Sequence, residues 1–334
     1  MKKLIKCLMI LPLFLLMGCG TKTSEEVVKD LESKVEETKS YIMEGEMDVV
    51  SGANTFSYDV EISYVNDEFY KVSLTNKNTN QIQIILKNAD GVYVLTPALN
   101  KSFKFESDWP YNNSQAYLFQ SVVRDIVNDG EREMIEEEGK YIFKTKANYI
   151  NNNKITSQVI TMTKDLKLES VVVYDEDENE VIIVRYSKVD FDTKFADDYF
   201  MLEQNMTVAR ANLDDSMPVY SGELETLYPI YLPMNTSLKK ESLIDDESGQ
   251  RVILEFVGES SFTLVQQKVT PSDSFSIITL YGEPALLSSG VGFLTDNSIT
   301  WMVNDVEMYV VSSDLSEEEL YNIAESVGVF QFAK

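Results

Sequence analysis

Histidine is absent from all 334 residues, and cysteine occurs only at Cys7 and Cys19. Ser-His-Asp catalysis, Cys-His catalysis and every histidine-ligated metal site need a histidine side chain, so the sequence excludes them. An enzyme built from this chain would depend on carboxylate, lysine, tyrosine or serine-lysine chemistry. No spacing among the acidic residues singles out a catalytic pair. We therefore predict a protein that is not an enzyme and that uses no cofactor or metal.

Positive charge is scarce, because 29 Lys and Arg residues stand against 55 Asp and Glu residues and the formal net charge is −26. Nucleic acid and anionic membrane surfaces repel a body of that charge, so the sequence predicts no nucleic-acid partner. Hydrophobic residues make up 44% of the chain, which is enough for substantial buried cores. The length predicts two domains.

The N-terminus has the pattern of a secretory signal peptide. Lys2 and Lys3 precede an apolar run, Cys7–Met17, that is shorter than the ~20 residues needed to span a bilayer. The residues Leu16–Cys19 resemble the bacterial lipobox, in which the cysteine thiol receives diacylglycerol and the peptidase cuts in front of it. The alternatives are an ordinary signal peptide with a chance cysteine and an uncleaved anchor.

We therefore predict that residues 1–18 are removed, that Cys19 carries the lipid and that residues 19–23 form a tether. Two acyl chains hold a protein durably, because each buried methylene contributes ~0.8 kcal/mol. With Cys7 removed and Cys19 acylated, no thiol pair is left for a disulfide. The sequence thus predicts an extracytoplasmic protein that is anchored to the cytoplasmic membrane through Cys19.

Residues 24–205 are predicted to form an α+β domain. Thr23 and Glu26 have the spacing of a capping box in front of an amphipathic helix. From Tyr41 onward apolar and polar residues alternate, and a second helix, capped by Ser114, interrupts this pattern. Strands are expected near 58–64, 68–75, 82–86, 91–96, 101–106, 140–147, 154–163, 168–174 and 180–190. Because so long a sheet must twist and curl, we expect an antiparallel half-barrel with the helices on its concave side.

A small C-terminal α+β domain is predicted for residues 218–334, after a linker at 206–217. A capping box of Ser316 and Glu319 opens its closing helix. Its strands are expected near 251–257, 261–268, 275–281, 291–295, 298–303 and 306–312.

Residues 88–110 carry a resemblance to a known family. They contain an Asp-Gly turn, the strand Val92–Thr96, a proline that ends it, a second strand with alternating phenylalanines and the sequence Asp-Trp-Pro at 108–110. This pattern resembles the LolA-like lipoproteins, and in particular the YdcC-type lipoproteins of endospore-forming bacteria. Through Leu280–Gly282, the strand at 299–301 and its closing helix, the C-terminal domain is similar to a domain of unknown function common in Gram-positive lipoproteins.

The resemblance implies a half-closed barrel whose concave apolar face accommodates acyl chains, lipids or lipoproteins, in envelope or spore-envelope assembly. In the related GerS-type lipoproteins the same fold supports a cortex-modifying amidase. A lipid on Cys19 would tie this chain to one membrane, which argues against a shuttling carrier. Three functions therefore stay open: binding or sensing of an apolar ligand such as a lipid or lipoprotein, non-catalytic support of a cell-wall enzyme, and an enzyme in its own right. The third predicts carboxylates that converge in a cleft.

Aromatic residues are the candidates for a ligand-binding face. In a cupped sheet such side chains line the mouth and contact a lipid or peptide. The alternative is that they belong to the core. The candidates are Tyr93, Phe103, Phe105, Trp109 and Tyr117.

Two acidic motifs have simpler interpretations than binding sites. Asp175, Asp177 and Asn179 match only the first three positions of a calcium loop, which favours a charged hairpin tip. The acidic run from Glu131 to Glu138 is interpreted as a solvated connector, with a docking surface for a basic partner as the alternative.

Replacement of Cys19 tests the predicted anchor. Cys19→Ala lacks the thiol that accepts diacylglycerol, so we expect it to lose acylation and membrane attachment. The measurements are the mass of the N-terminal peptide and the share of the protein that sediments with membranes. Cys7→Ala is the matched control, and a Cys19→Ala protein that behaves like this control would contradict lipidation.

Overall fold

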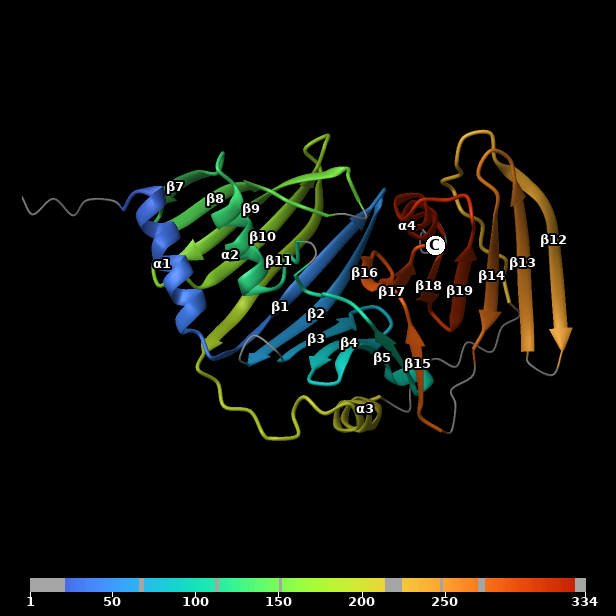
Figure 1. The fold of residues 1–334 in the computed structure, drawn as a ribbon, viewed down its shortest axis with the longest axis horizontal. Helices are drawn as coiled ribbons and strands as arrows, with labels where there is room; N and C mark the ends of the chain where they lie inside the picture. Colours follow the sequence, from blue (N-terminus) through green and yellow to red (C-terminus); the bar gives the residue numbers. More distant parts are fainter. Residues whose placement is uncertain are drawn as a thin grey trace, which may run out of the picture.

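The computed structural model describes residues 22–65, 69–111, 114–149, 152–213, 224–246, 249–269 and 274–327. The predicted signal peptide and Cys19 lie outside these residues. Two sheets lie side by side, and the four described α-helices pack against them (Figure 1). The predicted α+β class is confirmed. None of the described helices is both long and apolar enough to cross a membrane.

The first sheet has twelve described strands in the order β15-β6-β5-β4-β3-β2-β1-β11-β10-β9-β8-β7. Neighbours are antiparallel except for β15, which joins β6 in parallel. β1 and β2 pair along their whole length and form the long centre of the curled sheet (Figure 1). The strands are β1 (Ser40–Ser51), β2 (Asn54–Val65), β3 (Phe69–Asn76), β4 (Ile82–Asn88), β5 (Gly91–Thr96), β6 (Lys101–Phe105), β7 (Glu133–Glu137), β8 (Lys140–Lys146), β9 (Ile155–Thr163), β10 (Leu168–Asp175), β11 (Glu180–Phe191) and β15 (Ser276–Leu280).

The second sheet has seven described strands in the order β12-β13-β14-β19-β18-β17-β16. The helix α4 (Glu317–Ser326) packs on it through Leu320 and Ile323, and the predicted capping box of Ser316 and Glu319 is confirmed. The strands are β12 (Ser237–Asp246), β13 (Gly249–Val257), β14 (Phe262–Lys268), β16 (Glu283–Leu287), β17 (Gly290–Thr295), β18 (Ser298–Val303) and β19 (Val306–Val311).

Two helices, α1 (Ser24–Glu37) and α2 (Phe119–Asn128), cover the concave side of the first sheet (Figure 1). The predicted capping box at the start of α1 is confirmed. The prediction that Ser114 caps α2 is wrong, because the helix begins at Phe119 and has no side-chain cap. Ser114 is instead joined to Asn148 by two hydrogen bonds, of 2.7 and 2.8 Å, which use its backbone N–H and its hydroxyl.

Aromatic side chains fill the space between these helices and the sheet. Tyr41 stacks on Tyr64 with 5.0 Å between ring centroids, and Tyr64 lies 5.0 Å from Tyr70. Trp109 continues the row at 5.8 Å from Tyr70 and is only 1% exposed. Full burial of a large apolar side chain stabilises the fold by roughly 1.5–3 kcal/mol. The concave side is therefore a packed core.

The opposite, outer face of the first sheet is covered in part by α3 (Leu202–Ala211). Successive strand residues point to opposite faces, so Ile85 joins the concave core whereas Ile84 packs with Leu202 and Met206 of α3. The sequence predicts no helix here, and α3 overlaps the linker predicted at 206–217. The reason is that few of the ten residues of α3 are apolar and buried, which leaves a weak helical pattern.

β15 joins the two sheets. Along the chain it follows β14 of the second sheet, but it pairs with β6 of the first sheet. From the sequence, this segment is expected in the C-terminal domain. Alternation predicts a strand but does not indicate which strand it pairs with. Beside it, Phe103 of β6 stacks on Phe293 of β17 with 3.9 Å between ring centroids.

Two polar contacts strengthen the junction between the sheets. Gln83 of β4 forms hydrogen bonds of 2.7 and 3.1 Å with the backbone N–H and carbonyl of Val291. Tyr58 of β2 donates a hydrogen bond of 2.6 Å to the carbonyl of Ser288. The two sheets thus share apolar and polar contacts over several strands.

Three strands are not predicted by the sequence. β7 lies in the acidic run interpreted as a connector, and β12 is exposed along nearly all of its length. Neither shows the alternation that marks a half-buried strand. β16 contains Pro284, which disfavours a strand unless it lies at the edge of a sheet.

Loss of the contact between Phe103 and Phe293 should lower the stability of the fold strongly. Phe293→Ala removes a ring that is 1% exposed, so we expect the free energy of unfolding to fall by about 3–5 kcal/mol. Tyr281→Ala is the control, because Tyr281 is 76% exposed and its loss should change stability by less than about 0.5 kcal/mol. Urea unfolding followed by circular dichroism measures both. Equal effects of the two substitutions would contradict this assignment of the core.

Candidate functional site

The five aromatic residues predicted to bind a ligand are buried and do not share one mouth. Phe103 is covered by Phe293 in the core. Tyr93 belongs to the cluster under α3, on the opposite face of the sheet from Phe103. A ligand that reaches Phe103 would have to displace Phe293. Buried to 5% exposure or less are Tyr93, Phe103, Phe105, Trp109 and Tyr117.

Tyr117 lines a small inner pocket where the first sheet meets the second. Tyr149 and Tyr321 contribute aromatic rings to it, and Ile155 and Leu286 contribute aliphatic side chains. Its volume is about 50 Å³. That is room for on the order of one or a few water molecules, and too little for an acyl chain.

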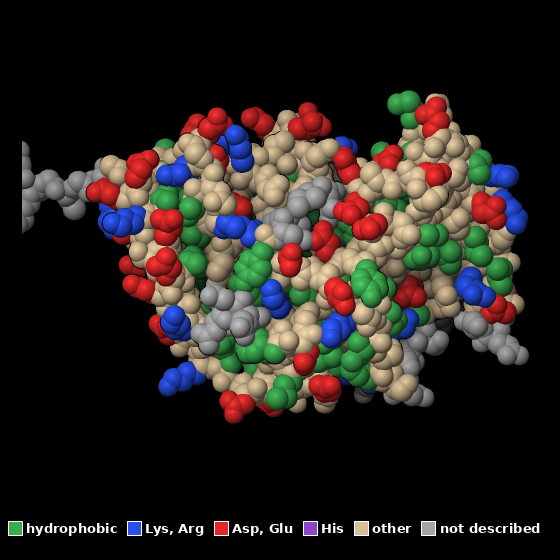
Figure 2. Space-filling model, viewed as in Figure 1, with side chains coloured by type: hydrophobic (Ala, Val, Ile, Leu, Met, Phe, Trp, Pro, Cys, Tyr) green, Lys and Arg blue, Asp and Glu red, His purple; other side chains and the backbone are tan. Residues whose placement is uncertain are grey.

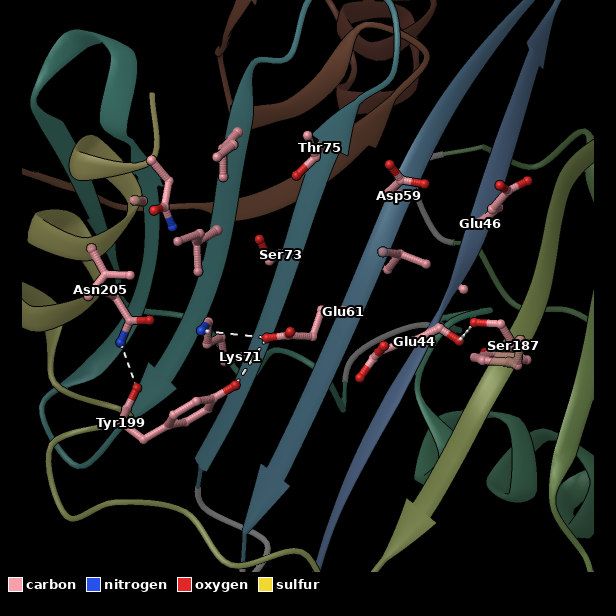
Figure 3. Close-up of a pocket in the computed structure, with 18 of the residues that line it drawn as sticks. Glu44, Glu46, Asp59, Glu61, Lys71, Ser73, Thr75, Ser187, Tyr199 and Asn205 are labelled. Atoms are coloured by element: carbon pink, nitrogen blue, oxygen red, sulfur yellow. Dashed lines mark hydrogen bonds and ion pairs between the residues drawn. The ribbon is translucent and has the colours of Figure 1, made fainter. Parts of the chain in front are cut away.

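A much larger groove, of about 830 Å³, lies on the outer face of the first sheet (Figure 3). Strands β11, β1, β2, β3 and β4 form its floor, mostly with side chains of the outer face, and α3 with the segment before it forms one side. The charged residues that line it are Glu44, Glu46, Asp59, Glu61, Lys71 and Arg185.

Two pairs of carboxylates face each other across β1 and β2. Glu44 lies directly opposite Glu61, and Glu46 lies directly opposite Asp59. Like charges in directly opposed positions destabilise an antiparallel sheet. Lys77 offsets part of this repulsion, because its ammonium lies 2.6 Å from Glu46 and 3.7 Å from Asp59. The side chains of Glu46 and Asp59 are still 58% and 63% exposed, so they present negative charge to solvent.

Lys71 is the buried cation of the groove. Its ammonium lies 3.7 Å from the Glu61 carboxylate and 4.3 Å from the ring centre of Tyr199 (Figure 3). Tyr199 donates a hydrogen bond of 3.0 Å to the same carboxylate. Only 15% of the Lys71 side chain is exposed. Burial lowers the pKa of Lys71 below its usual 10.5, although Glu61 acts in the opposite direction.

The helix α3 forms one side of the groove. Asn205 fixes the start of the helix, because its amide donates hydrogen bonds of 2.7 and 2.9 Å to the carbonyls of Tyr199 and Met201 (Figure 3). Val208 follows on the side of the helix that lines the groove and is 46% exposed. The groove therefore combines an acidic floor with an exposed apolar side chain on one side.

An acidic, open groove of this kind can attract positively charged groups. In the part of the chain that the structure describes, no group of three or more acidic, cysteine or histidine side chains is placed to hold a metal ion. The carboxylate of Glu61 is engaged by Lys71 and Tyr199. The sequence does not predict the groove, because its floor depends on the register of five strands and one side depends on a helix with a weak pattern.

The chain is similar over nearly its whole length to one curated protein. The sporulation protein YdcC of Bacillus subtilis (strain 168) is 38% identical over 319 residues, which cover 95% of this chain and 94% of that protein. No family model matches the chain.

Two solved structures show weaker similarity. A LolA superfamily protein from Nitrosomonas europaea is 12% identical, with 55% of this chain and 100% of that chain covered and a TM-score of 0.33. A chain in the structure of the CwlD amidase from Clostridioides difficile in complex with the GerS lipoprotein is 17% identical, with coverages of 54% and 100% and a TM-score of 0.31.

The lowered pKa of Lys71 predicts that the free energy of unfolding rises at alkaline pH. Its pKa is lower in the folded protein than in the unfolded chain, so between the two values the unfolded state binds more protons and the free energy of unfolding rises with pH. Lys71→Met should abolish this part of the pH dependence. Urea unfolding of both proteins between about pH 8 and 10.5 measures the difference. Parallel pH profiles would contradict the burial of Lys71.

Proposed function

The chain belongs to the family of the sporulation protein YdcC, and on this premise we propose that it is a lipid-anchored, extracytoplasmic protein that binds a partner protein and catalyses no reaction itself. The observation that carries the proposal is the contrast between the two faces of the first sheet. The concave face is a packed core, whereas the outer face has an open groove of about 830 Å³. We assign this binding to sporulation, because the relative is a sporulation protein.

The N-terminal pattern supports the location. The lipobox-like residues Leu16–Cys19 make Cys19 the proposed lipid attachment site. α1 begins at Ser24, so the tether between the lipid and the folded body is short. A body held in this way stays close to the membrane surface, where it meets membrane-bound or wall-bound partners.

The groove suggests the chemistry of the partner. Its exposed carboxylates, Glu46 and Asp59, attract a basic segment, and the exposed Val208 offers a contact for an apolar side chain. Complementary charge increases the rate of association and suppresses wrong partners. The resemblance to GerS-type lipoproteins makes a cell-wall enzyme, such as a spore-cortex amidase, the partner class that we propose.

A test of the groove uses a labelled, capped peptide of eight residues that alternates lysine and leucine. Glu46→Gln combined with Asp59→Asn removes two exposed charges from the groove, so we expect binding to weaken about tenfold, equivalent to about 1.4 kcal/mol. Fluorescence anisotropy at about physiological salt, where the screening length is ~8 Å, measures the affinity.

A matched control separates the groove from the overall negative charge of the chain. Glu176→Gln combined with Asp177→Asn removes the same charge at the exposed turn between β10 and β11, outside the groove. This variant should bind the peptide like the parent. Equal weakening in both double variants, or no weakening in either, would contradict a partner site in the groove.

An apolar ligand is the second candidate function. It rests on the family resemblance alone, because the inner pocket that Tyr117 lines is too small for an acyl chain. Native mass spectrometry of residues 23–334, before and after incubation with fatty acid and phospholipid, tests it. A bound lipid of defined mass that disappears in Tyr117→Ala would support this function. An unchanged protein mass after incubation is the result that we expect, and it would count against lipid binding.

A further inference from the structure

β15 is an edge strand of the first sheet, and no strand among the described residues pairs with its outer side. It is the last strand of the sheet, and the N–H of Ser276 donates a hydrogen bond of 3.2 Å to the carbonyl of Asn100, next to β6. In a parallel pair, alternate residues of a strand direct their N–H and C=O groups to the same neighbour. The backbone groups of Ile277 and Thr279 therefore point away from β6, toward the open side.

The side chains of β15 are apolar or uncharged on both faces. Ile277 is 49% exposed and Ile278 is 38% exposed. Tyr281, directly after the strand, is 76% exposed. Hydrophobic side chains are visible at the surface around β15 in the space-filling view (Figure 2). An exposed, hydrophobic edge strand is a template for pairing with another chain.

The other terminal strands of the two described sheets are protected. β7 carries three glutamates, and β12 carries lysines and acidic residues. β16 contains Glu283 and Pro284. Charges and prolines are the devices by which proteins prevent pairing at a sheet edge. Among the four terminal strands described, β15 alone has neither a charge nor a proline.

We propose that β15 binds an extended, uncharged segment of a partner protein, which adds a strand to the first sheet. The unpaired backbone groups of Ile277 and Thr279 require an extended chain as the occupant. Ile277 and Ile278 lie on opposite faces, so the segment carries β-branched or other apolar residues on both faces. A charged side chain beside Ile277 and Ile278 would lose hydration without gaining an ion pair within β15.

A second copy of this chain is a poor occupant. Each copy carries a formal net charge of −26, so two copies repel each other. Five strand residues span only ~17 Å. Such a contact falls well short of the ~1,600 Å² that a stable protein interface buries, whereas a partner that is also held elsewhere needs only a short additional strand.

The test uses a capped synthetic peptide, Thr-Val-Ile-Thr-Val-Thr, and the protein from residue 20 to 334 without its lipid. Hydrogen exchange should show that the peptide protects the amides of Ile277 and Thr279 and leaves the exchange of β7 and β12 unchanged. Ile277→Pro removes an outward N–H, and at a strand edge proline is tolerated. We expect it to weaken the peptide affinity about tenfold, whereas the control Ile277→Val should retain it.

A second variant distinguishes a loss of peptide binding from a folding defect. Thr279→Lys keeps the backbone but places a charge on the edge, and it should also weaken binding while the unfolding temperature stays unchanged. Protection at β12 in place of β15, or unchanged affinity in Ile277→Pro and Thr279→Lys, would overturn the proposal. A dimer in sedimentation velocity that Ile277→Pro dissolves would also overturn it, in favour of a second copy.

Discussion

The alternation of side chains along β1 and β2 is the constraint on which the rest of the structure depends. The two strands pair from Ser40 opposite Val65 to Ser51 opposite Asn54, and this register places Tyr41 and Tyr64 on the concave side. The same register places acidic side chains on the outer side. A slip of one residue would move carboxylates into the core and aromatic rings into water, so the register is strongly specified.

Because of this register, the two faces of the first sheet have different roles. The concave face is used for stability, because the aromatic row and the helices α1 and α2 fill it. The outer face carries charged side chains and is partly covered by α3, and an open groove lies on it. Lysine side chains offset part of the repulsion between the opposed carboxylates on β1 and β2, yet Glu46 and Asp59 stay 58% and 63% exposed to solvent. The binding site that we propose therefore lies on the outer side, in contrast to the concave site that the family resemblance implies.

How far the sequence predicts this structure depends on the kind of signal that each element carries. The capping boxes at Thr23 and Ser316 and the alternating strands are local patterns, and the structure confirms them. The start of α2 is not predicted, because Ser114 finds its partner in Asn148, far away in sequence. The placement of β15 and the burial of Phe103 against Phe293 depend on contacts between distant segments. The groove requires both the register and α3, so no single stretch of sequence contains it.

We propose that a partner occupies the outer groove in the cell while the concave side stays packed. The chain has no cysteine after Cys19, so a cysteine placed at Ser73, which lines the groove, is a specific probe for thiol labelling. The most direct measurement compares maleimide labelling of Ser73→Cys with that of Glu176→Cys, at the exposed β10–β11 turn, in purified protein and on intact sporulating cells. We expect both cysteines to react in the purified protein and only Ser73→Cys to be protected on cells. Equal reactivity of the two on cells, or protection of Ser73→Cys already in the purified protein, would contradict it.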